Sequence, residues 1–185
     1  MENYVSNVGD FIDDLTEEAT KEHAVWEPKH GVTNHGFQTS PIIFHTGEHC
    51  RMLENFVREE IDLYRTRFRL EDCEYMNQWP AEFDLRGWFV RLLQDGYQNS
   101  HIHPSGWLSG IIYLDTVETS DDDQGAIELG LHGYDLPILD SNFPRITHRP
   151  KPGDIVLFPS SLFHRTIPFV KDTERTVIAF DLHRL

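Results

Sequence analysis

Two histidines one residue apart, His101 and His103, stand in the segment HIHPSGWLSGIIYLD at 101–115. On a β-strand alternate side chains share a face, so both imidazoles are expected to point the same way. A third histidine, His164, lies in the segment PSSLFHRT at 159–166. Three neutral imidazoles facing one point would suit Fe(II), Zn(II) or another first-row metal, and would leave positions open for other ligands. The three histidines therefore predict a metal site.

Two further side chains could serve a ligand of that metal. Arg175 begins the segment RTVIAFDL at 175–182, where alternation places it on one face with Val177 and Ala179. An arginine behind a metal can hold a carboxylate in a bidentate grip. Tyr113 could add a hydroxyl to the same carboxylate. The arrangement suits a dicarboxylate that chelates the metal at one end and meets Arg175 at the other.

The elements that must position these residues indicate a β-rich core preceded by helices. Helical spacing of apolar residues predicts a first helix around 8–15 and a second over Glu48–Phe68, with Thr46 as its N-cap and a short strand at 41–44 before it. From about residue 84, short apolar runs punctuated by Gly, Pro and Asp predict eight strands. These are Trp88–Leu93, Gln98–His103, Ser109–Leu114, Ala126–Leu131, Arg145–His148, Ile155–Pro159, Phe163–Phe169 and Arg175–Leu182.

Eight short strands fit a double-sheet jelly roll, the cupin-like double-stranded β-helix. The expected fold is thus mainly β with N-terminal helices. We expect one domain over 1–185, with a helical support region at 1–80 and the β-helix core at 81–185, since 185 residues are too few for two full-sized domains.

Composition excludes some classes of partner. Sixteen Lys and Arg stand against 31 Asp and Glu, a formal charge of -15, which argues against binding to nucleic acid or to an anionic membrane. The acidic N-terminal segment lacks the pattern of a signal peptide, and no apolar run approaches the length of a membrane span. The two cysteines, Cys50 and Cys73, form no C-x-x-C pair. We therefore expect a cytoplasmic protein.

Four segments in order resemble the Fe(II)/2-oxoglutarate-dependent oxygenases. They are most similar to the prolyl-hydroxylase-like domain that also occurs at the C-terminus of some tetratricopeptide-repeat proteins. The segments are WFVRLL at 88–93, HIHPSGWLSG at 101–110, GDIVLFPSSLFHRTIPF at 153–169 and RTVIAFDL at 175–182. The first 75 residues contribute little to this resemblance.

The resemblance implies a role for each site residue. It makes His101 the first metal ligand and His164 the distal one, while Arg175 binds the C5 carboxylate of 2-oxoglutarate. Tyr113 stands where related prolyl hydroxylases place a tyrosine on the same carboxylate. The wider superfamily has H-x-D or H-x-E, so His103 occupies the carboxylate position, although H-x-H-P is usual in the nearer subfamily. Three arrangements stay open: His103 ligates the metal, two histidines and water suffice, or Glu128 supplies a carboxylate.

The implied reaction consumes 2-oxoglutarate and O2, gives succinate and CO2, and hydroxylates an unidentified substrate. Two alternatives are a cupin-type three-histidine dioxygenase that needs no 2-oxoglutarate and a non-catalytic jelly roll that binds metal or carboxylate. Arg175 argues against the first alternative, which has no need of a C5-carboxylate clamp. Substrate specificity is expected in loops and in the N-terminal helices over the barrel mouth. The same helices could equally form a homodimer.

His45 and His49, in the segment HTGEH, also invite a metal interpretation. Their order is not H-E-x-x-H, and Gly47 beside Thr46 indicates a helix start between them. We therefore expect both histidines to be structural.

Overall fold

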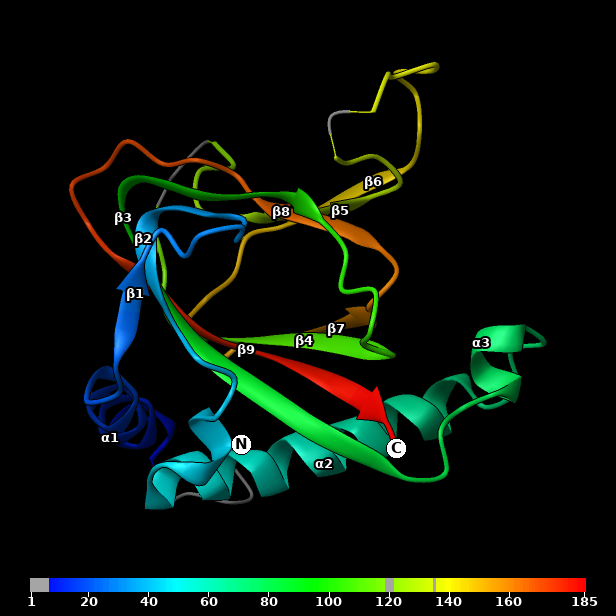
Figure 1. Ribbon diagram of the computed structural model, residues 1–185, viewed down its shortest axis with the longest axis horizontal. Coiled ribbons are helices and arrows are strands. Elements are labelled where there is room, and N and C mark those ends of the chain that lie inside the picture. The colour runs from blue at the N-terminus through cyan, green and yellow to red at the C-terminus, as the bar shows by residue number, and fades with distance from the viewer. Residues whose placement is uncertain (1–6, 119–121, 135) are drawn as a thin grey trace.

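A computed structural model describes residues 7–118, 122–134 and 136–185 (Figure 1). The helical elements are α1 (Val8–Thr20), η1 (Ile43–His45), α2 (Glu48–Phe68) and α3 (Glu74–Asn77). The strands are β1 (Ala24–Trp26), β2 (Thr33–Thr39), β3 (Phe83–His101), β4 (Leu108–Asp115), β5 (Ile127–Gly130), β6 (Arg145–His148), β7 (Ile155–Pro159), β8 (Phe163–Thr166) and β9 (Arg175–Arg184). None of the described helices is both long enough and apolar enough to cross a membrane.

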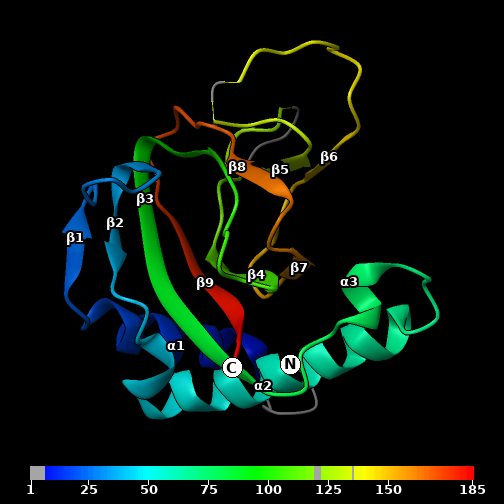
Figure 2. The same cartoon turned by 45° about the vertical axis from the view of Figure 1, so that its right-hand side comes forward.

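The nine described strands form one antiparallel sheet that curls on itself. Its order is β6-β5-β8-β3-β9-β4-β7, and β2 pairs with β3 and carries β1. The first part of β3 pairs with β9, from Phe83 opposite Arg184 to Leu92 opposite Arg175. Its last part pairs with β8 instead, and Figure 2 shows the strand bending over to reach it. The two halves face each other across the interior, which confirms the predicted double-stranded β-helix with N-terminal helices.

The long strand β3 joins two elements that the sequence predicts as separate strands, 88–93 and 98–103. Asp95 has a φ of 63°, and a Cβ on Gly96 would lie 2.5 Å from the carbonyl oxygen of Leu93. These residues therefore bend the chain sharply without ending the strand. The strand ends at His101, so His103 lies just beyond it. The expectation that His103 shares a strand with His101 is wrong.

The helices cover the outer face of the curled sheet, away from the barrel interior (Figure 1). Alternation along β3 explains the two layers, since Phe89 packs with the helices whereas Val90 packs inside the barrel. The same outer core holds Phe44, whose ring centroid lies 6.2 Å from that of Phe180 on β9. The helices thus pack on the outer face of the sheet, on the side opposite the histidines. The expectation from the sequence that they lie over the barrel mouth is wrong.

The start of α2 differs from the prediction. The N-cap is Gly47, and the Thr46 hydroxyl instead donates to the carbonyl of Ile43, because the predicted strand at 41–44 is a 3-10 turn that Thr46 closes. The capping group comes from α1: a carboxylate oxygen of Glu18 accepts from the backbone N–H of Glu48, and the other accepts from that of Cys50, each at 3.1 Å. A Cβ on Gly47 would lie 1.9 Å from this carboxylate, so the cap requires glycine.

Candidate metal centre

Three histidines converge inside the barrel. His101 ends β3 and lies directly opposite His164 on the antiparallel neighbour β8. His103 follows two residues later and returns toward the same point, where its Nε2 lies 3.1 Å from the Nε2 of His101. One ring nitrogen from each histidine lies within 4.8 Å of the others. His101 and His164 are buried and His103 is partly exposed, so this group could hold a metal ion with a side open to ligands.

Each imidazole is held through its Nδ1. The carbonyl oxygen of Asn99 lies 2.6 Å from the Nδ1 of His101, and that of Leu162 lies 3.1 Å from the Nδ1 of His164. The Nδ1 of His103 lies 2.6 Å from a carboxylate oxygen of Asp181. These partners accept hydrogen bonds, so each Nδ1 carries the proton and each Nε2 keeps a lone pair for the shared point.

Burial keeps the rings of His101 and His164 neutral. It lowers the pKa of His101 to about 4, although the hydrogen bond to the Asn99 carbonyl opposes this effect. Burial, together with the neighbouring His101 and His103, also lowers the pKa of His164 well below its ordinary value. A metal ligand must be a neutral imidazole, and near pH 7 both rings meet that condition.

A small cavity of about 150 Å³ adjoins the three histidines. Its walls include Trp88, whose ring centroid lies 5.5 Å from that of His103, and Phe158, 4.6 Å from His164. This volume lies below the roughly 300–1,000 Å³ of pockets for drug-sized ligands. The cavity therefore suits a small ligand next to the metal position.

Arg175 and Tyr113 meet deeper in the same barrel. Arg175 is 1% exposed, its Nε donates to the carbonyl of Gly125 at 2.9 Å, and its guanidinium carbon lies 5.0 Å from the centre of the Tyr113 ring. Burial lowers the pKa of Arg175 and raises that of Tyr113, and in each case the neighbouring group opposes the shift. Within the described chain, both Nη atoms of Arg175 and the Tyr113 hydroxyl have no hydrogen-bond partner. A buried cation with free donors fits a carboxylate, because a buried polar group without a partner is costly.

Neither Arg175 nor Tyr113 is among the described residues that line the small cavity. The cavity wall holds Ile111 and Ala179, which pair across β4 and β9, and the next pair on the same face of these strands is Tyr113 with Val177. The structure thus brings the three histidines together at one point and the arginine and tyrosine at another. Ile111 and Ala179 on the cavity wall belong to the same apolar cluster of the barrel interior as Tyr113 and Val177.

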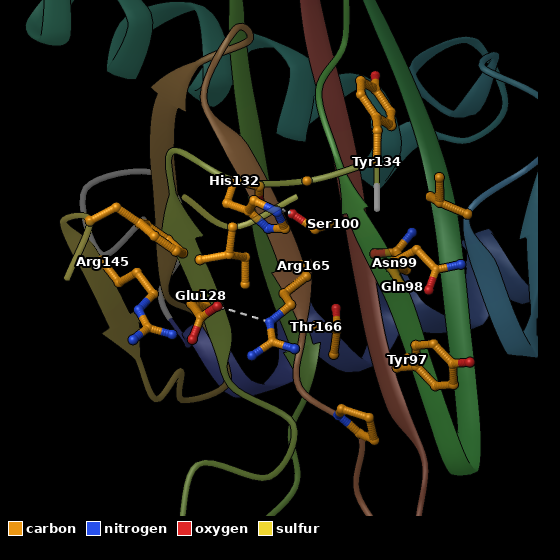
Figure 3. Close-up of a pocket in the computed structure, with 15 residues that line it drawn as sticks. Tyr97, Gln98, Asn99, Ser100, Glu128, His132, Tyr134, Arg145, Arg165 and Thr166 are labelled. Carbon is orange, nitrogen blue, oxygen red and sulfur yellow. Dashed lines mark hydrogen bonds and ion pairs between the residues drawn. The ribbon is translucent and has the colours of Figure 1, made fainter. Parts of the chain in front are cut away.

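Glu128 does not reach the metal centre. On β5 it pairs with Arg165, whereas its neighbour Leu129 pairs with His164, so Glu128 lies on the opposite face of the sheet. Its carboxylate accepts from the Nε of Arg165 at 2.9 Å, and the two residues line a separate cavity of about 550 Å³ together with Arg145 and Tyr134. Figure 3 shows this bond among the residues that line the cavity. The proposal that Glu128 supplies the missing carboxylate is wrong, because the strand pairing turns it outward.

Asp181 is the site residue that sequence reasoning missed. It is 5% exposed and accepts at 2.6 Å from the hydroxyl of Ser109, which lies 2.8 Å from the hydroxyl of Ser160. Alternation along β9 from Arg175 through Val177 and Ala179 reaches Asp181 and offered a signal for it. The carboxylate of the site therefore lies behind His103.

A jelly roll with converging imidazoles, and with a buried arginine whose Nη atoms have no partner among the described residues, is typical of non-haem metal enzymes that bind a carboxylate cosubstrate. Residues 86–181 match the family described as "Putative 2OG-Fe(II) oxygenase". The chain belongs to this family and is an Fe(II)- and 2-oxoglutarate-dependent oxygenase.

Solved structures share the fold at low identity. A prolyl-4-hydroxylase from Pseudomonas putida superposes with a TM-score of 0.65 at 16% identity, covering 96% of this chain and 88% of that one. HygX from Streptomyces hygroscopicus, with nickel and 2-oxoglutarate bound, gives 0.65 at 14% identity over 95% and 79%. The Trichoplax adhaerens prolyl hydroxylase, in complex with a hypoxia inducible factor peptide fragment, gives 0.64 at 13% over 95% and 78%. No curated protein sequence matches the chain.

Proposed function

We propose that this oxygenase hydroxylates a C–H bond of a small molecule or peptide. His101, His103 and His164 would hold Fe(II), and Arg175 with Tyr113 would hold the C5 carboxylate of 2-oxoglutarate. The observation that carries the proposal is a fully buried arginine whose two Nη atoms find no partner in the described part of the chain, in the same barrel interior as three converging imidazoles. Such an arginine is costly unless an anion joins it.

The reaction balances with one O2 for each substrate. His101, His103 and His164 would hold the Fe(II), which would supply the activation of O2. One oxygen atom of O2 would enter the substrate C–H bond as a hydroxyl, and the other would enter succinate as 2-oxoglutarate loses CO2. The chain would orient the cosubstrate between two anchors and surround the reacting centre with apolar walls such as Ile111 and Phe158. The bidentate grip of Arg175 would fix the far carboxylate, so that the 2-oxo acid end meets the metal.

The substrate class follows from weaker observations. The net charge of -15 disfavours a highly anionic substrate. Solved structures of similar fold hold hygromycin B or a peptide fragment, so an aminoglycoside and a proline-containing peptide are sensible first probes. The homodimer and the cytoplasmic location expected from the sequence stay predictions.

The test is release of CO2 from 2-oxoglutarate labelled at C1, with Fe(II) and O2, in the presence of each probe. We expect Fe(II)-dependent release with matching succinate, greatly reduced in Arg175→Met. Arg165→Met is the matched control, since Arg165 lies on the outer face of β8. Oxidation of a probe with no consumption of 2-oxoglutarate would instead support the three-histidine dioxygenase.

A further inference from the structure

Among the three histidines of the metal centre, His103 is anchored differently from the others. The Nδ1 atoms of His101 and His164 bond to the carbonyl two residues earlier in their own segments. The strand backbone therefore sets the position of those two rings. His103 lies beyond the end of β3, and its Nδ1 bonds to Asp181, 78 residues away on β9.

The carboxylate of Asp181 is itself held from two sides of the barrel. Its Oδ1 lies 2.6 Å from the Nδ1 of His103 and accepts from the Ser109 hydroxyl at 2.6 Å. Ser109 lies opposite Asp181 in the register of β4 and β9, and its hydroxyl also lies 2.8 Å from that of Ser160. Asp181, Ser109 and Ser160 are all buried. The carboxylate therefore lies on a strand of the sheet, whereas His103 lies beyond one, where its backbone N–H donates to the carbonyl of Ser160 at 2.9 Å.

We propose that Asp181 is a positioning residue that makes His103 the third metal ligand. By accepting the Nδ1 hydrogen it holds the ring in one orientation and directs the Nε2 lone pair at the point shared with His101 and His164. In an H-x-D site the carboxylate binds the metal directly. In this protein the carboxylate of Asp181 would instead bind the ring of His103, and His103 would bind the metal. The inference rests on the ligand role of His103 in the proposed function.

A purely structural role would not explain this arrangement. Burying a carboxylate is costly, and an apolar side chain would fill the same space on β9 more favourably. The cost is offset by hydrogen bonds from the Ser109 hydroxyl and from the ring of His103, whose other nitrogen points at the metal position. Hydrogen bonds from a carboxylate to a metal-bound imidazole orient the ligand and raise its basicity.

The test measures Co(II) affinity by spectroscopic titration of the full chain, with no cosubstrate and no turnover. Asp181→Asn should bind Co(II) about 10- to 100-fold more weakly than the wild type, the usual loss when such a bond is removed. The matched control is Asp154→Asn, which removes another carboxylate bonded to a histidine, His148, at 3.1 Å on the surface. Its affinity should be unchanged. Equal affinity of Asp181→Asn and the wild type would overturn the proposal.

The same substitution in a protein that lacks His103 distinguishes an effect of Asp181 on that ring from a general disturbance of the site. In a His103→Ala protein, adding Asp181→Asn should change Co(II) affinity by less than about twofold, because Asp181 acts only through that ring. An equal loss in both backgrounds would overturn the proposal.

If Asp181→Asn fails to fold, two measurements replace it. Ser109→Ala, which removes one hydrogen bond to the carboxylate, should weaken Co(II) binding about 2- to 10-fold. Nitrogen NMR of the metal-free wild type should show His103 protonated at Nδ1, and an Nε2–H form would overturn the proposal. Neither the Co(II) titration nor the NMR measurement needs 2-oxoglutarate. Both would therefore still test the role of Asp181 if the protein showed no oxygenase activity.

Discussion

Two histidine–carboxylate pairs in this protein have the same Nδ1–carboxylate contact but lie in different surroundings. His49 on α2 bonds through Nδ1 to Glu18 on α1 at 2.9 Å, and His103 bonds through Nδ1 to Asp181 on β9 at 2.6 Å. Each pair joins elements far apart in the chain. They differ at the other ring nitrogen: the Nε2 of His49 lies 3.5 Å from a carboxylate of Asp14, whereas that of His103 lies 3.1 Å from another imidazole.

The comparison shows that surroundings, and not the pair itself, decide the role. Glu18 also caps the N-terminus of α2, so its pair with His49 ties two helices together. Asp181 bonds otherwise to a buried serine, so its pair with His103 ties a loop to the barrel. The first pair should therefore affect stability, and the second should affect metal binding.

The largest expected effect separates the two regions directly. His164→Ala removes one of three converging nitrogens and should weaken Co(II) binding by more than the roughly 10–100-fold expected when only an orienting hydrogen bond is lost. His49→Ala should leave the affinity unchanged. The measurement is a spectroscopic Co(II) titration of both variants, and loss of binding in His49→Ala would break the comparison.

Arg175→Met tests the other end of the site. Removing one member of a buried charge pair costs about 2–5 kcal/mol, so the Kd of 2-oxoglutarate should rise accordingly. Arg175→Lys keeps the charge but not the planar fork and should recover only part of this loss. Calorimetric titration of the Co(II)-loaded proteins measures each value. A Kd within twofold of the wild type for Arg175→Met would remove the arginine from the cosubstrate site.

Glu18→Gln should act on stability alone. Partial burial would raise the pKa of Glu18, but hydrogen bonds from the His49 ring and from the backbone N–H groups of Cys50 and His49 outweigh it and lower the pKa from 4.5 to about 2. The folded carboxylate thus binds its proton less readily than the unfolded one. Its contribution is fully present above pH 4.5 and is lost as the pH falls through 2.

The expected loss for Glu18→Gln is about 1–3 kcal/mol in the free energy of unfolding at pH 7. The difference from the wild type should shrink between pH 4.5 and pH 2. Urea unfolding at several pH values measures both quantities. A difference independent of pH would show that the charge of Glu18 plays no part, and a changed Co(II) affinity would contradict the division of roles.

Tyr113→Phe should have the smallest effect. The substitution keeps the ring beneath the Arg175 guanidinium and removes only a hydroxyl that has no partner within the described chain. One hydrogen bond contributes about 0.5–1.5 kcal/mol, so the Kd of 2-oxoglutarate should rise by about 2- to 10-fold. An unchanged Kd would leave Arg175 as the sole clamp of the carboxylate.

Local patterns predicted some elements well. The helix Glu48–Phe68 and the strands Arg145–His148 and Ile155–Pro159 have the predicted bounds, because their residues carry clear periodicity or are bounded by turn residues. The strand Thr33–Thr39, TNHGFQT, was missed since its polar residues and Gly36 show no such pattern.

Contacts between side chains on different strands depend on how the strands pair, and local sequence patterns do not predict this pairing. Glu128 and His164 lie on adjacent strands, but only their register shows that they face opposite sides. Likewise the bond between His103 and Asp181 needs the register that sets Ser109 opposite Asp181. The convergence of the three histidines could be predicted because histidines at metal-ligand spacing are recognisable in the sequence without a strand register, whereas their role as ligands stays a prediction.

The most direct test of the account is an anaerobic titration of the Fe(II)-loaded protein with 2-oxoglutarate, followed by the visible metal-to-ligand charge-transfer band. The account predicts a saturable band in the wild type and in His49→Ala, greatly weakened in Arg175→Met and absent in His164→Ala. No band in a folded, iron-loaded wild-type protein would contradict the joint site of three histidines and Arg175.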